Sequence, residues 1–376
     1  MTADAYNAVI TWVTDPEPRL PPVDEAAGPL AGMRLLVKDL IDTAGVRTTY
    51  GSKIYADHVP TVTAPAAQRL LDAGATLVGK ANLHEFAFGV TSQNPWYGTV
   101  RNPVHPGLIA GGSSGGNAAA LAAGMCDLAL GTDTGCSIRL PAACCEVVGL
   151  KPRLGSVSTE GVFPLCPSFD TVGPMALTVR DVTAAWSVLT GKPVPEPRLD
   201  GLTVGLLRQA PSVGDGVMPE PSDAAEAYVG RLQELGARVV EALVPEPQAS
   251  MSQLFYHEAA EQHRATFPSR ADEYGDNVRT KLELGQGLDT ADVEAAYRAV
   301  ATWRSYVPDV DLFVSPCVGV EIPPDDCDEI ELRPGVSAFL RWVNLLGWAG
   351  LAIGNLQLVA PHDETVLAAG LAWERG

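Results

Sequence analysis

Two glycine- and serine-rich turns and one lysine are the residues of this chain whose types could perform chemistry together. The turns occupy residues 111–116 and 131–137, and an alanine-rich segment of helical composition separates them. Glycine at this density lets other groups approach the main chain closely, beside serine hydroxyls and backbone N–H groups. The lysine is Lys38, which directly follows the apolar run at 33–37. The two turns suit either phosphate binding or acyl transfer.

Phosphate binding is the weakest of three interpretations of the turns. The first turn reads GGSSGGN, which lacks the Gly-Lys-Ser/Thr ending of a Walker A loop and contains no GxGxxG. No lysine in the turn is therefore placed to meet phosphate oxygens.

The nucleophile elbow of an α/β-hydrolase is the second interpretation. Ser113 and Ser114 each lie at the centre of a G-x-S-x-G match, but that fold also needs an acid and a histidine downstream. His362 has roughly the right relative place. For His257, His263 and His362 alike, however, a solvated surface side chain is the simpler interpretation.

A serine hydrolase that uses lysine as its base is the third interpretation. A serine hydroxyl needs a base, and a desolvated neutral lysine can serve. A second serine can carry the proton between them, because a hydroxyl both donates and accepts. Lys38, Ser113 and Ser137 supply these parts, and the turn at 134–136 supplies backbone N–H groups for an oxyanion. The alternative for Lys38 is a side chain that extends along the apolar strand to water.

Six motifs extend the pattern along the chain. They are VKD at 37–39, NLHEFAFG at 82–89, GGSSGG at 111–116, GTDTGCSIR at 131–139, PAACCEVVGLKP at 141–152 and FDTVGPM at 169–175. In these motifs and their spacing, with 75 residues from Lys38 to Ser113 and 24 from Ser113 to Ser137, the chain resembles the amidase signature family. The resemblance is dense over roughly residues 30–185 and returns more weakly towards the C-terminus.

The resemblance implies a role for each motif residue. It implies that Ser137 is the nucleophile, that Ser113 is a bridging serine held in a cis peptide, and that Lys38 is the base. It assigns the oxyanion hole to the backbone of Thr134, Gly135 and Cys136. It implies supporting positions at Ser114, Asp133 and Arg139.

The chain departs from the family pattern in two respects. Cys136 stands where the family usually has a second glycine, and a positive φ there would cost about 1 kcal/mol for cysteine. Cys136 is not expected to be the nucleophile itself, because no histidine or acid is placed to make it a thiolate. The chain is also shorter than the family norm at its N-terminal side and between Gly350 and Leu356. We therefore expect a pocket that is more open or is completed by a partner subunit.

Apolar residues near the motifs are candidates for the substrate pocket. By resemblance these are Ala87 and Phe88, with Phe163, Leu165 and Trp342 as weaker candidates. They would favour an aryl or alkyl acyl group, and ordinary core packing is an equally good interpretation of each. Arg139 suggests a carboxylate-bearing substrate, but an internal ion pair with Asp133 or another acid is the simpler expectation.

Composition and charge indicate which kinds of partner and cofactor the protein is expected to bind. The chain of 376 residues carries a formal net charge of −19, which disfavours binding to nucleic acid or to an anionic membrane surface. Its seven cysteines form no C-x-x-C pair, so we expect free thiols in a reducing cytoplasm and neither a metal nor another cofactor. The sequence has no signal-peptide pattern at its start and no run of about 18 apolar residues. A homodimer is compatible with the sequence.

The elements that would position the candidate residues follow a β-α-β pattern. Strands at 33–37 and 75–79 flank a helix at 64–73, which predicts a parallel strand pair. The pattern returns with strands at 202–207 and 238–240 around a helix at 223–235. Further expected elements are helices at 5–13, 178–190, 338–346 and 365–375, and strands at 310–314 and 356–360.

These elements predict the α/β fold class. The resemblance implies one large α/β/α sandwich around a twisted, mixed and mostly parallel sheet. We expect a single domain over 1–376, with a catalytic core at 30–185 and the charged helical segment 250–305 as a cover over the site.

The expected activity is that of a serine hydrolase acting on carbon–nitrogen bonds other than peptide bonds. The resemblance implies cleavage of a small aryl or alkyl amide through an acyl-enzyme on Ser137. Alternatives are the glutaminase-type subunit of an amidotransferase, and a hydrolase of esters, carbamates or urea-like substrates. A catalytically inactive, amidase-like binding module is the alternative from a different class.

Overall fold

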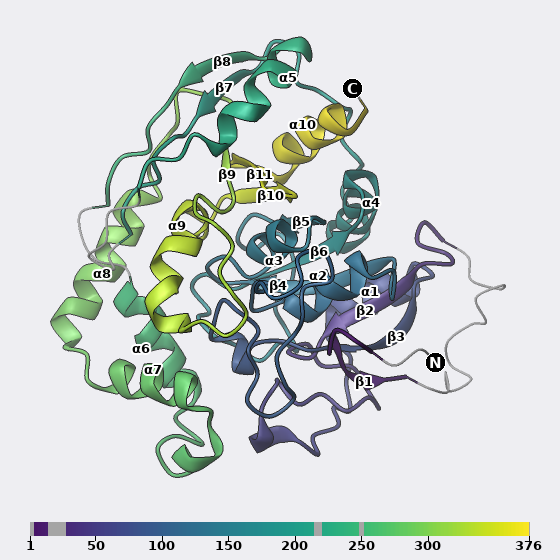
Figure 1. The fold of residues 1–376 in the computed structure, drawn as a ribbon, viewed down its shortest axis with the longest axis vertical. Coiled ribbons are helices and arrows are strands. Elements are labelled where there is room, and N and C mark those ends of the chain that lie inside the picture. The colour runs from purple at the N-terminus through teal and green to yellow at the C-terminus, as the bar shows by residue number, and fades with distance from the viewer. Residues whose placement is uncertain (1–3, 14–27, 214–219, 248–251, 376) are drawn as a thin grey trace.

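The fold is built on one large sheet. The computed structural model describes residues 4–13, 28–213, 220–247 and 252–375, and within them eleven strands pair in the order β1-β3-β2-β4-β6-β5-β10-β11-β9-β7-β8 (Figure 1). The strands are β1 Val9–Trp12, β2 Arg34–Lys38, β3 Thr76–Ala81, β4 Leu128–Asp133, β5 Val148–Lys151, β6 Thr171–Ala176, β7 Thr203–Leu206, β8 Arg238–Glu241, β9 Leu312–Pro316, β10 Ala349–Ile353 and β11 Leu356–Ala360.

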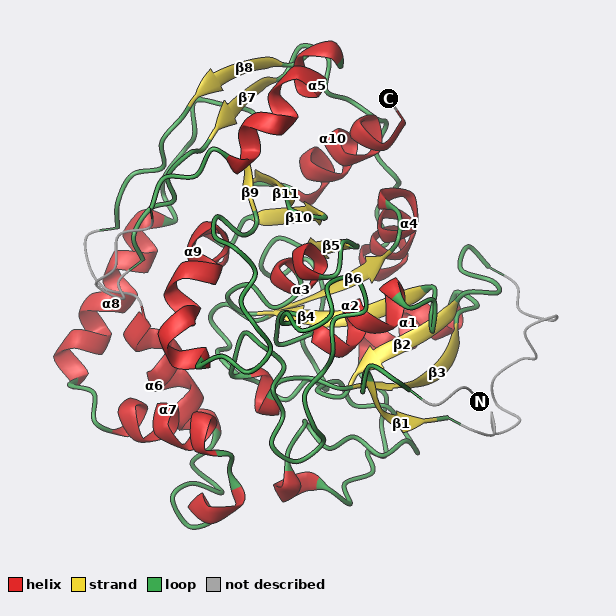
Figure 2. Cartoon of the chain, in the orientation of Figure 1, coloured by secondary structure: helices red, strands yellow, loops and turns green. Residues whose placement is uncertain are grey.

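Helices cover both faces of this sheet (Figure 2). They are α1 Pro65–Asp72, α2 Gly115–Ala122, α3 Arg139–Cys144, α4 Val179–Thr190, α5 Val229–Glu234, α6 Ser252–Gln262, α7 Asp276–Gln286, α8 Thr290–Trp303, α9 Glu329–Leu346 and α10 Asp363–Arg375. Within the described ranges, none of the helices is both long enough and apolar enough to cross a membrane.

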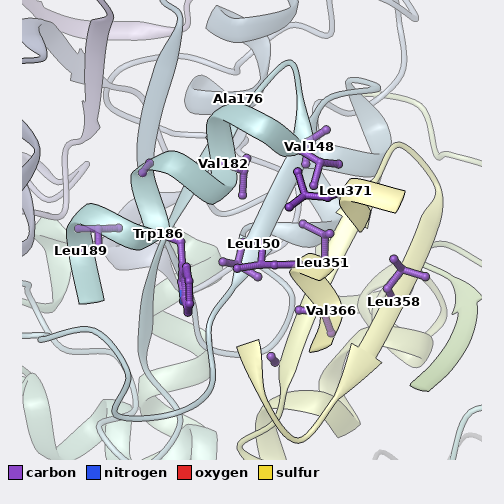
Figure 3. Packing of buried hydrophobic residues seen from close by; sticks show 14 of the residues in the cluster. Val148, Leu150, Ala176, Val182, Trp186, Leu189, Leu351, Leu358, Val366 and Leu371 are labelled. Carbon is purple, nitrogen blue, oxygen red and sulfur yellow. The ribbon is translucent and has the colours of Figure 1, made fainter. Parts of the chain in front are cut away.

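Apolar side chains that alternate along the strands form a hydrophobic core on each face of the sheet. In β2, Leu35 and Val37 join the core under α1, α4 and α10, whereas Leu36 joins the core under α2 and α3, because successive side chains of a strand point to opposite faces. Figure 3 shows the first of these cores, where Trp186 of α4 lies close to side chains from β5 and α10. This α/β/α layering confirms the predicted fold class.

The sheet is mixed, as expected, but the expectation of a mostly parallel sheet is wrong. β2 runs parallel to β3 and β4, and β7 runs parallel to β8 and β9. The other six neighbouring pairs are antiparallel and include the whole centre of the sheet. The β-α-β pattern predicted two of the four parallel pairs, β2 with β3 and β7 with β8. Four central strands, β4, β5, β6 and β10, were not predicted; β6 lies in a stretch rich in turn residues, and β10 is rich in alanine and glycine.

The predicted N-terminal helix at 5–13 is also wrong. This segment contains β1, which pairs antiparallel with β3 at the edge of the sheet. Its sequence, VITW, consists of β-branched and aromatic residues that favour a strand. The predicted helix at 178–190 is confirmed as α4, with Thr178 as its N-cap: the Thr178 hydroxyl accepts from the main-chain N–H of Asp181 at 3.0 Å.

The first β-α-β unit brings the candidate residues to one end of the sheet. α1 begins with Pro65, a position where proline needs no hydrogen-bond partner, and it returns the chain so that β3 lies parallel to β2. β4 joins the other side of β2, with Val37 opposite Leu130. The carboxyl ends of β2 and β4 are therefore neighbours, and Lys38 emerges beside Thr132 and Asp133.

The segment predicted as a helical cover contains α6, α7 and α8. These helices lie together beside α9 at one side of the molecule in Figure 1. α6 contributes Ser252, Phe255 and Tyr256 to the pocket described below.

Candidate active site

Lys38 is fully buried at the end of β2. Its Nζ donates to the hydroxyl of Ser113 at 2.7 Å and to that of Thr132 at 2.8 Å. Burial lowers the pKa of Lys38 to about 7, against the opposing charges of Asp133 and Asp170. Of the two interpretations of Lys38, extension to water is therefore wrong, and a desolvated amine in contact with a serine is what the fold contains.

The turn that carries Ser113 is packed tightly against its neighbours. The peptide bond between Gly112 and Ser113 is cis, as the resemblance implied. A Cβ at Gly112 would lie 2.8 Å from the backbone nitrogens of Thr91 and Ser92, so this approach admits only glycine. The main-chain N–H of Ser114 donates to the carbonyl of Ser137 at 3.2 Å, and this bond joins the two glycine-rich turns.

The second turn presents backbone donors beside Ser137. Within the described residues, the N–H groups of Thr134, Gly135 and Cys136 have no protein acceptor, and all three residues line a pocket together with Ser137. The Thr134 hydroxyl donates to Asp170 at 2.6 Å, which anchors the loop. The arrangement provides the type of donors that an oxyanion requires.

The substitution of cysteine at position 136 does not impose the expected conformational cost. Neither Gly135 nor Cys136 has a positive φ, so a side chain is tolerated at either residue. The Cys136 thiol is buried and donates to the carbonyl of Gly112 at 3.8 Å. Burial raises the pKa of this thiol to about 12, which leaves it protonated and a poor nucleophile.

Asp133 and Arg139 form a buried ion pair below the loop. Nε and Nη2 of Arg139 donate to the two carboxylate oxygens of Asp133, each at 3.1 Å. The carboxylate also accepts from the main-chain N–H of Ile138 at 3.0 Å and from the amide of Asn344 at 2.8 Å. Burial alone would raise the pKa of Asp133, but the charge and hydrogen bonds of Arg139 hold it at about 2. The pair thus fixes the main chain directly after Ser137.

Ser114 also supports the turns. It precedes α2, and its hydroxyl donates to the carbonyl of Thr132 at 3.3 Å. Thr132 is the second hydroxyl that contacts Lys38, so Ser114 contacts the strand end that surrounds the amine.

A cavity of about 60 Å³ opens in front of Ser137. Of the predicted pocket residues, Ala87, Phe88 and Leu165 line it, whereas Phe163 and Trp342 do not. Phe163 packs against the rings of Tyr50 and Phe86, with centroids 4.8 and 5.0 Å away.

Trp342 is fully buried in the core and makes an edge contact with Phe313. Its neighbour Arg341 lines the pocket instead. Successive residues of a helix point in directions about 100° apart, and the weak C-terminal motif could not assign the register of α9.

Sequence reasoning missed most of the distant pocket wall. From α6 it missed Ser252, Phe255 and Tyr256, and from α9 it missed Arg333, Ser337 and Arg341. The α9 residues recur every four positions, a spacing typical of one helix face, and this signal could have identified them.

The histidines do not supply a hydrolase triad. None of the described residues that line the pocket is a histidine. The expectation of a surface side chain is wrong for His263, which is buried. Its ring shares a hydrogen bond of 3.0 Å with the Tyr274 hydroxyl and packs against Phe86. Burial lowers its pKa to about 3. In the described parts of the chain, no three His, Cys, Asp or Glu side chains are grouped so as to hold a metal ion.

Comparison with known proteins agrees with the motifs. The model of the family described as Amidase matches residues 14–351. A glutamyl-tRNA(Gln) amidotransferase subunit from Synechococcus sp. (strain RCC307) is 35% identical over 336 residues, which cover 77% of this chain and 69% of that protein. The corresponding protein from Natronomonas pharaonis is 41% identical over 271 residues, which cover 67% of this chain and 61% of that protein.

The fold has close counterparts among solved structures. A protein described as an amidase matches with a TM-score of 0.79 and 33% identity, covering 93% of this chain and 85% of that one. The range matched by the family model includes both glycine-rich turns. This chain belongs to the amidase family.

Proposed function

We propose that this protein hydrolyses the C–N bond of a carboxamide through an acyl-enzyme on Ser137. The observation that carries the proposal is the contact of 2.7 Å between the buried Lys38 amine and the Ser113 hydroxyl. With a pKa of about 7, a large fraction of Lys38 is neutral at neutral pH and can accept a proton.

In the proposed first half-reaction, Ser137 Oγ attacks the amide carbonyl carbon while its proton passes through Ser113 to Lys38. The N–H groups of Thr134, Gly135 and Cys136 hold the negative oxygen that forms. Collapse of this intermediate breaks the C–N bond, and the proton returns from Lys38 through Ser113 to the leaving nitrogen. An ester on Ser137 and a free amine or ammonia result.

The second half-reaction runs the same relay with water. Water attacks the ester carbonyl and gives its proton through Ser113 to Lys38. The bond to Ser137 Oγ then breaks as that oxygen regains the proton, which releases the carboxylic acid. Asp133 and Arg139 act through the main chain as positioning residues, because they contact the backbone beside Ser137 and not the pocket.

Retention of all three predicted catalytic residues, with the amine in contact with its serine, supports an enzyme over an inactive binding module.

A fluorophosphonate probe followed by peptide mass spectrometry tests the assignment of Ser137 as the nucleophile. We expect labelling on Ser137 and its loss in Ser137→Ala. Label that persists in Ser137→Ala, on Ser113 or Ser114, would contradict it.

The glutaminase subunit of an amidotransferase is the second candidate. The comparisons support it better than they support hydrolysis of a free small amide, because both relatives described above are named as parts of a glutamyl-tRNA(Gln) amidotransferase. Ammonia release from glutamine, measured beside a panel of small amides, esters and carbamates, separates the two. Glutamine turnover at rates far above the panel favours the glutaminase, and turnover of the panel without glutamine favours the amidase.

A further inference from the structure

The proposed relay makes no use of the side chains of the motif NLHEFAFG at 82–89, yet this motif forms one wall of the pocket. Residues 87–90 all line the cavity in front of Ser137. The wall begins in an unusual backbone conformation, because φ is 50° at Phe86 and 59° at Ala87. Residues with a side chain adopt this left-handed conformation only where the surrounding structure imposes it, and such positions cluster at functional sites. Contacts from outside the motif must therefore hold the wall.

A buried ion pair fixes the main chain of the wall on both sides of Gly89. The amine of Lys281, on α7, donates to the carbonyl of Phe88 at 2.7 Å. Glu329, the first residue of α9, accepts from the main-chain N–H of Val90 at 3.1 Å. The two side chains pair at 2.7 Å and are almost completely buried. Burial lowers the pKa of Lys281 to about 8, against the attraction of Glu329, so most of the amine is charged at neutral pH.

Asn277 joins this ion pair to the side chain of His84. Its amide lies one turn before Lys281 on α7, donates to Glu329 at 2.8 Å and accepts from Lys281 at 2.7 Å. These two charged partners fix the orientation of the amide. Its oxygen lies 3.1 Å from Nε2 of His84, which must therefore carry the proton of that ring. Burial lowers the pKa of His84 to about 4, so the ring is neutral. A Cβ at Gly89 would collide with this ring, which therefore packs directly against the wall.

Glu85 connects the same motif to the start of α7. Its carboxylate is fully buried and accepts at 2.9 Å from the main-chain N–H of Gly275, the residue before the helix. It also accepts from the hydroxyl of Ser52 and from the indole of Trp96, each at 2.7 Å. Together with the two contacts above, this bond joins α7 to the motif at three successive points.

The turn that carries Ser113 has bonds of its own. The Ser92 hydroxyl donates to the carbonyl of Gly111 at 2.8 Å, and the main-chain N–H of His84 donates to the carbonyl of Ser113 at 3.2 Å. Neither bond involves α7 or α9. Loss of the ion pair should therefore release the pocket wall and leave the base in contact with its serine.

We propose that Lys281, Asn277 and Glu329 form a clamp of positioning residues that holds the wall at 86–90 against the acyl part of the substrate. None of these three residues lines the cavity, so the clamp shapes the pocket through the main chain of the wall. The clamp rests on the proposed function, because the wall it holds faces Ser137. A wall that moves weakens the binding of ground state and transition state alike, which raises KM and leaves kcat almost unchanged.

Saturation kinetics of fluorophosphonate labelling separate binding from reactivity. We expect Lys281→Met to raise the half-saturating concentration of the probe at Ser137 by roughly tenfold to a hundredfold, because a displacement of about 1 Å can cost about a hundredfold. The limiting rate of labelling should stay close to that of the wild type, since Lys38 and Ser113 keep their contact. An unchanged half-saturating concentration, or equal losses in both quantities, overturns the clamp.

Amide hydrogen exchange tests the clamp without chemistry. A peptide that covers 84–92 should exchange faster in Lys281→Met than in the wild type, whereas a peptide that covers 128–133 should not change. Equal exchange at 84–92 in the two proteins would show that the wall does not need the ion pair, and would overturn the clamp.

Leu358→Ala is the matched control for a loss of stability. It removes a fully buried side chain from the core on the other face of the sheet, and a comparable loss of stability is expected from it. Its half-saturating concentration and its exchange at 84–92 should equal those of the wild type. If Leu358→Ala reproduces the effects of Lys281→Met, general destabilisation explains them and the clamp is wrong.

A second variant and a binding measurement complete the test. Lys281→Met leaves Glu329 buried without its cation; if it does not fold, Lys281→Met/Glu329→Gln, which removes both charges, replaces it. Calorimetry of benzamide with Ser137→Ala, with and without Lys281→Met, measures binding without turnover. Weaker benzamide binding in the Lys281 variant, with no label on Ser137 in the wild type, overturns the proposed hydrolysis and keeps the clamp. Labelling of Ser137, with benzamide and probe affinities that Lys281→Met leaves unchanged, does the reverse.

Discussion

The ammonium nitrogen of Lys38 lies 2.7 Å from the hydroxyl oxygen of Ser113, and both residues are completely buried. The lysine comes from the end of a central strand and the serine from a turn 75 residues later. The contact is made because β2 and β4 are parallel neighbours whose carboxyl ends meet, and because the tight turn at Gly112 places Ser113 over that edge.

Removal of the amine should abolish the relay. We expect Lys38→Ala to lower kcat by roughly 10²- to 10⁴-fold, the usual contribution of a general base. In the wild type, kcat/KM should rise with pH through a value near 7, because only the neutral amine accepts a proton and burial lowers its pKa to about 7. Lys192→Ala, at an exposed lysine on the surface, should leave both rate and pH profile unchanged. A flat profile between pH 5 and 9 would exclude Lys38 as the base.

The buried carboxylate of Asp133 should be essential for stability. Asp133→Asn leaves the Arg139 charge buried without its counter-ion, and we expect a loss of about 3–5 kcal/mol in the free energy of unfolding, measured with urea. Asp127→Asn breaks the exposed pair with Arg34 and should cost no more than about 1 kcal/mol. Equal effects of the two substitutions would contradict the importance of the buried pair.

The same pair predicts a direction for acid unfolding. The pKa of Asp133 is depressed from its ordinary 3.8 to about 2 in the folded state. A depressed pKa contributes stability above the unfolded value, and this contribution disappears as the pH falls from about 4 to about 2. Titration of urea midpoints should show a steeper loss over this window for the wild type than for Asp133→Asn.

Cys136 should be dispensable for turnover. Because its thiol is protonated and its φ is not positive, we expect Cys136→Ala to retain fluorophosphonate labelling and to lose only about 1 kcal/mol of stability. Iodoacetamide at neutral pH should not inactivate the wild type. Rapid alkylation of Cys136 with loss of activity would show that the thiol is more accessible and more acidic than its burial implies.

Gly112 should tolerate no side chain. A Cβ there would lie 2.8 Å from backbone nitrogens on the opposing segment, so Gly112→Ala must displace the turn that holds Ser113. We expect the activity of Gly112→Ala to fall strongly and its melting temperature to change much less. Gly230→Ala is the control, because a Cβ at that position in α5 meets nothing within 4 Å and alanine favours a helix. If Gly112→Ala keeps wild-type activity, the turn is more adaptable than its packing indicates.

Elements with strong local patterns could be predicted, and those without them could not. The first β-α-β unit and the cap of α4 depend on apolar runs, a glycine stop and one threonine, all within a few residues. β10 has the sequence AGLAI, which carries no strong preference, and it becomes a strand because β5 and β11 offer hydrogen bonds on both sides. The antiparallel centre of the sheet follows from such pairing and has no local signal.

The sequence by itself determined the family, the layered fold class and the identity of Lys38, Ser113 and Ser137 as candidates, because local motifs carry these residues: two glycine-rich turns hold the serines, and an apolar strand ends at the lysine. Only the tertiary structure decided that Lys38 is buried beside Ser113, and that Arg333 and Arg341 face Ser137 while Trp342 turns into the core. Burial and helix orientation depend on packing between segments some 200 residues apart, and no stretch of sequence records which neighbours a side chain will meet.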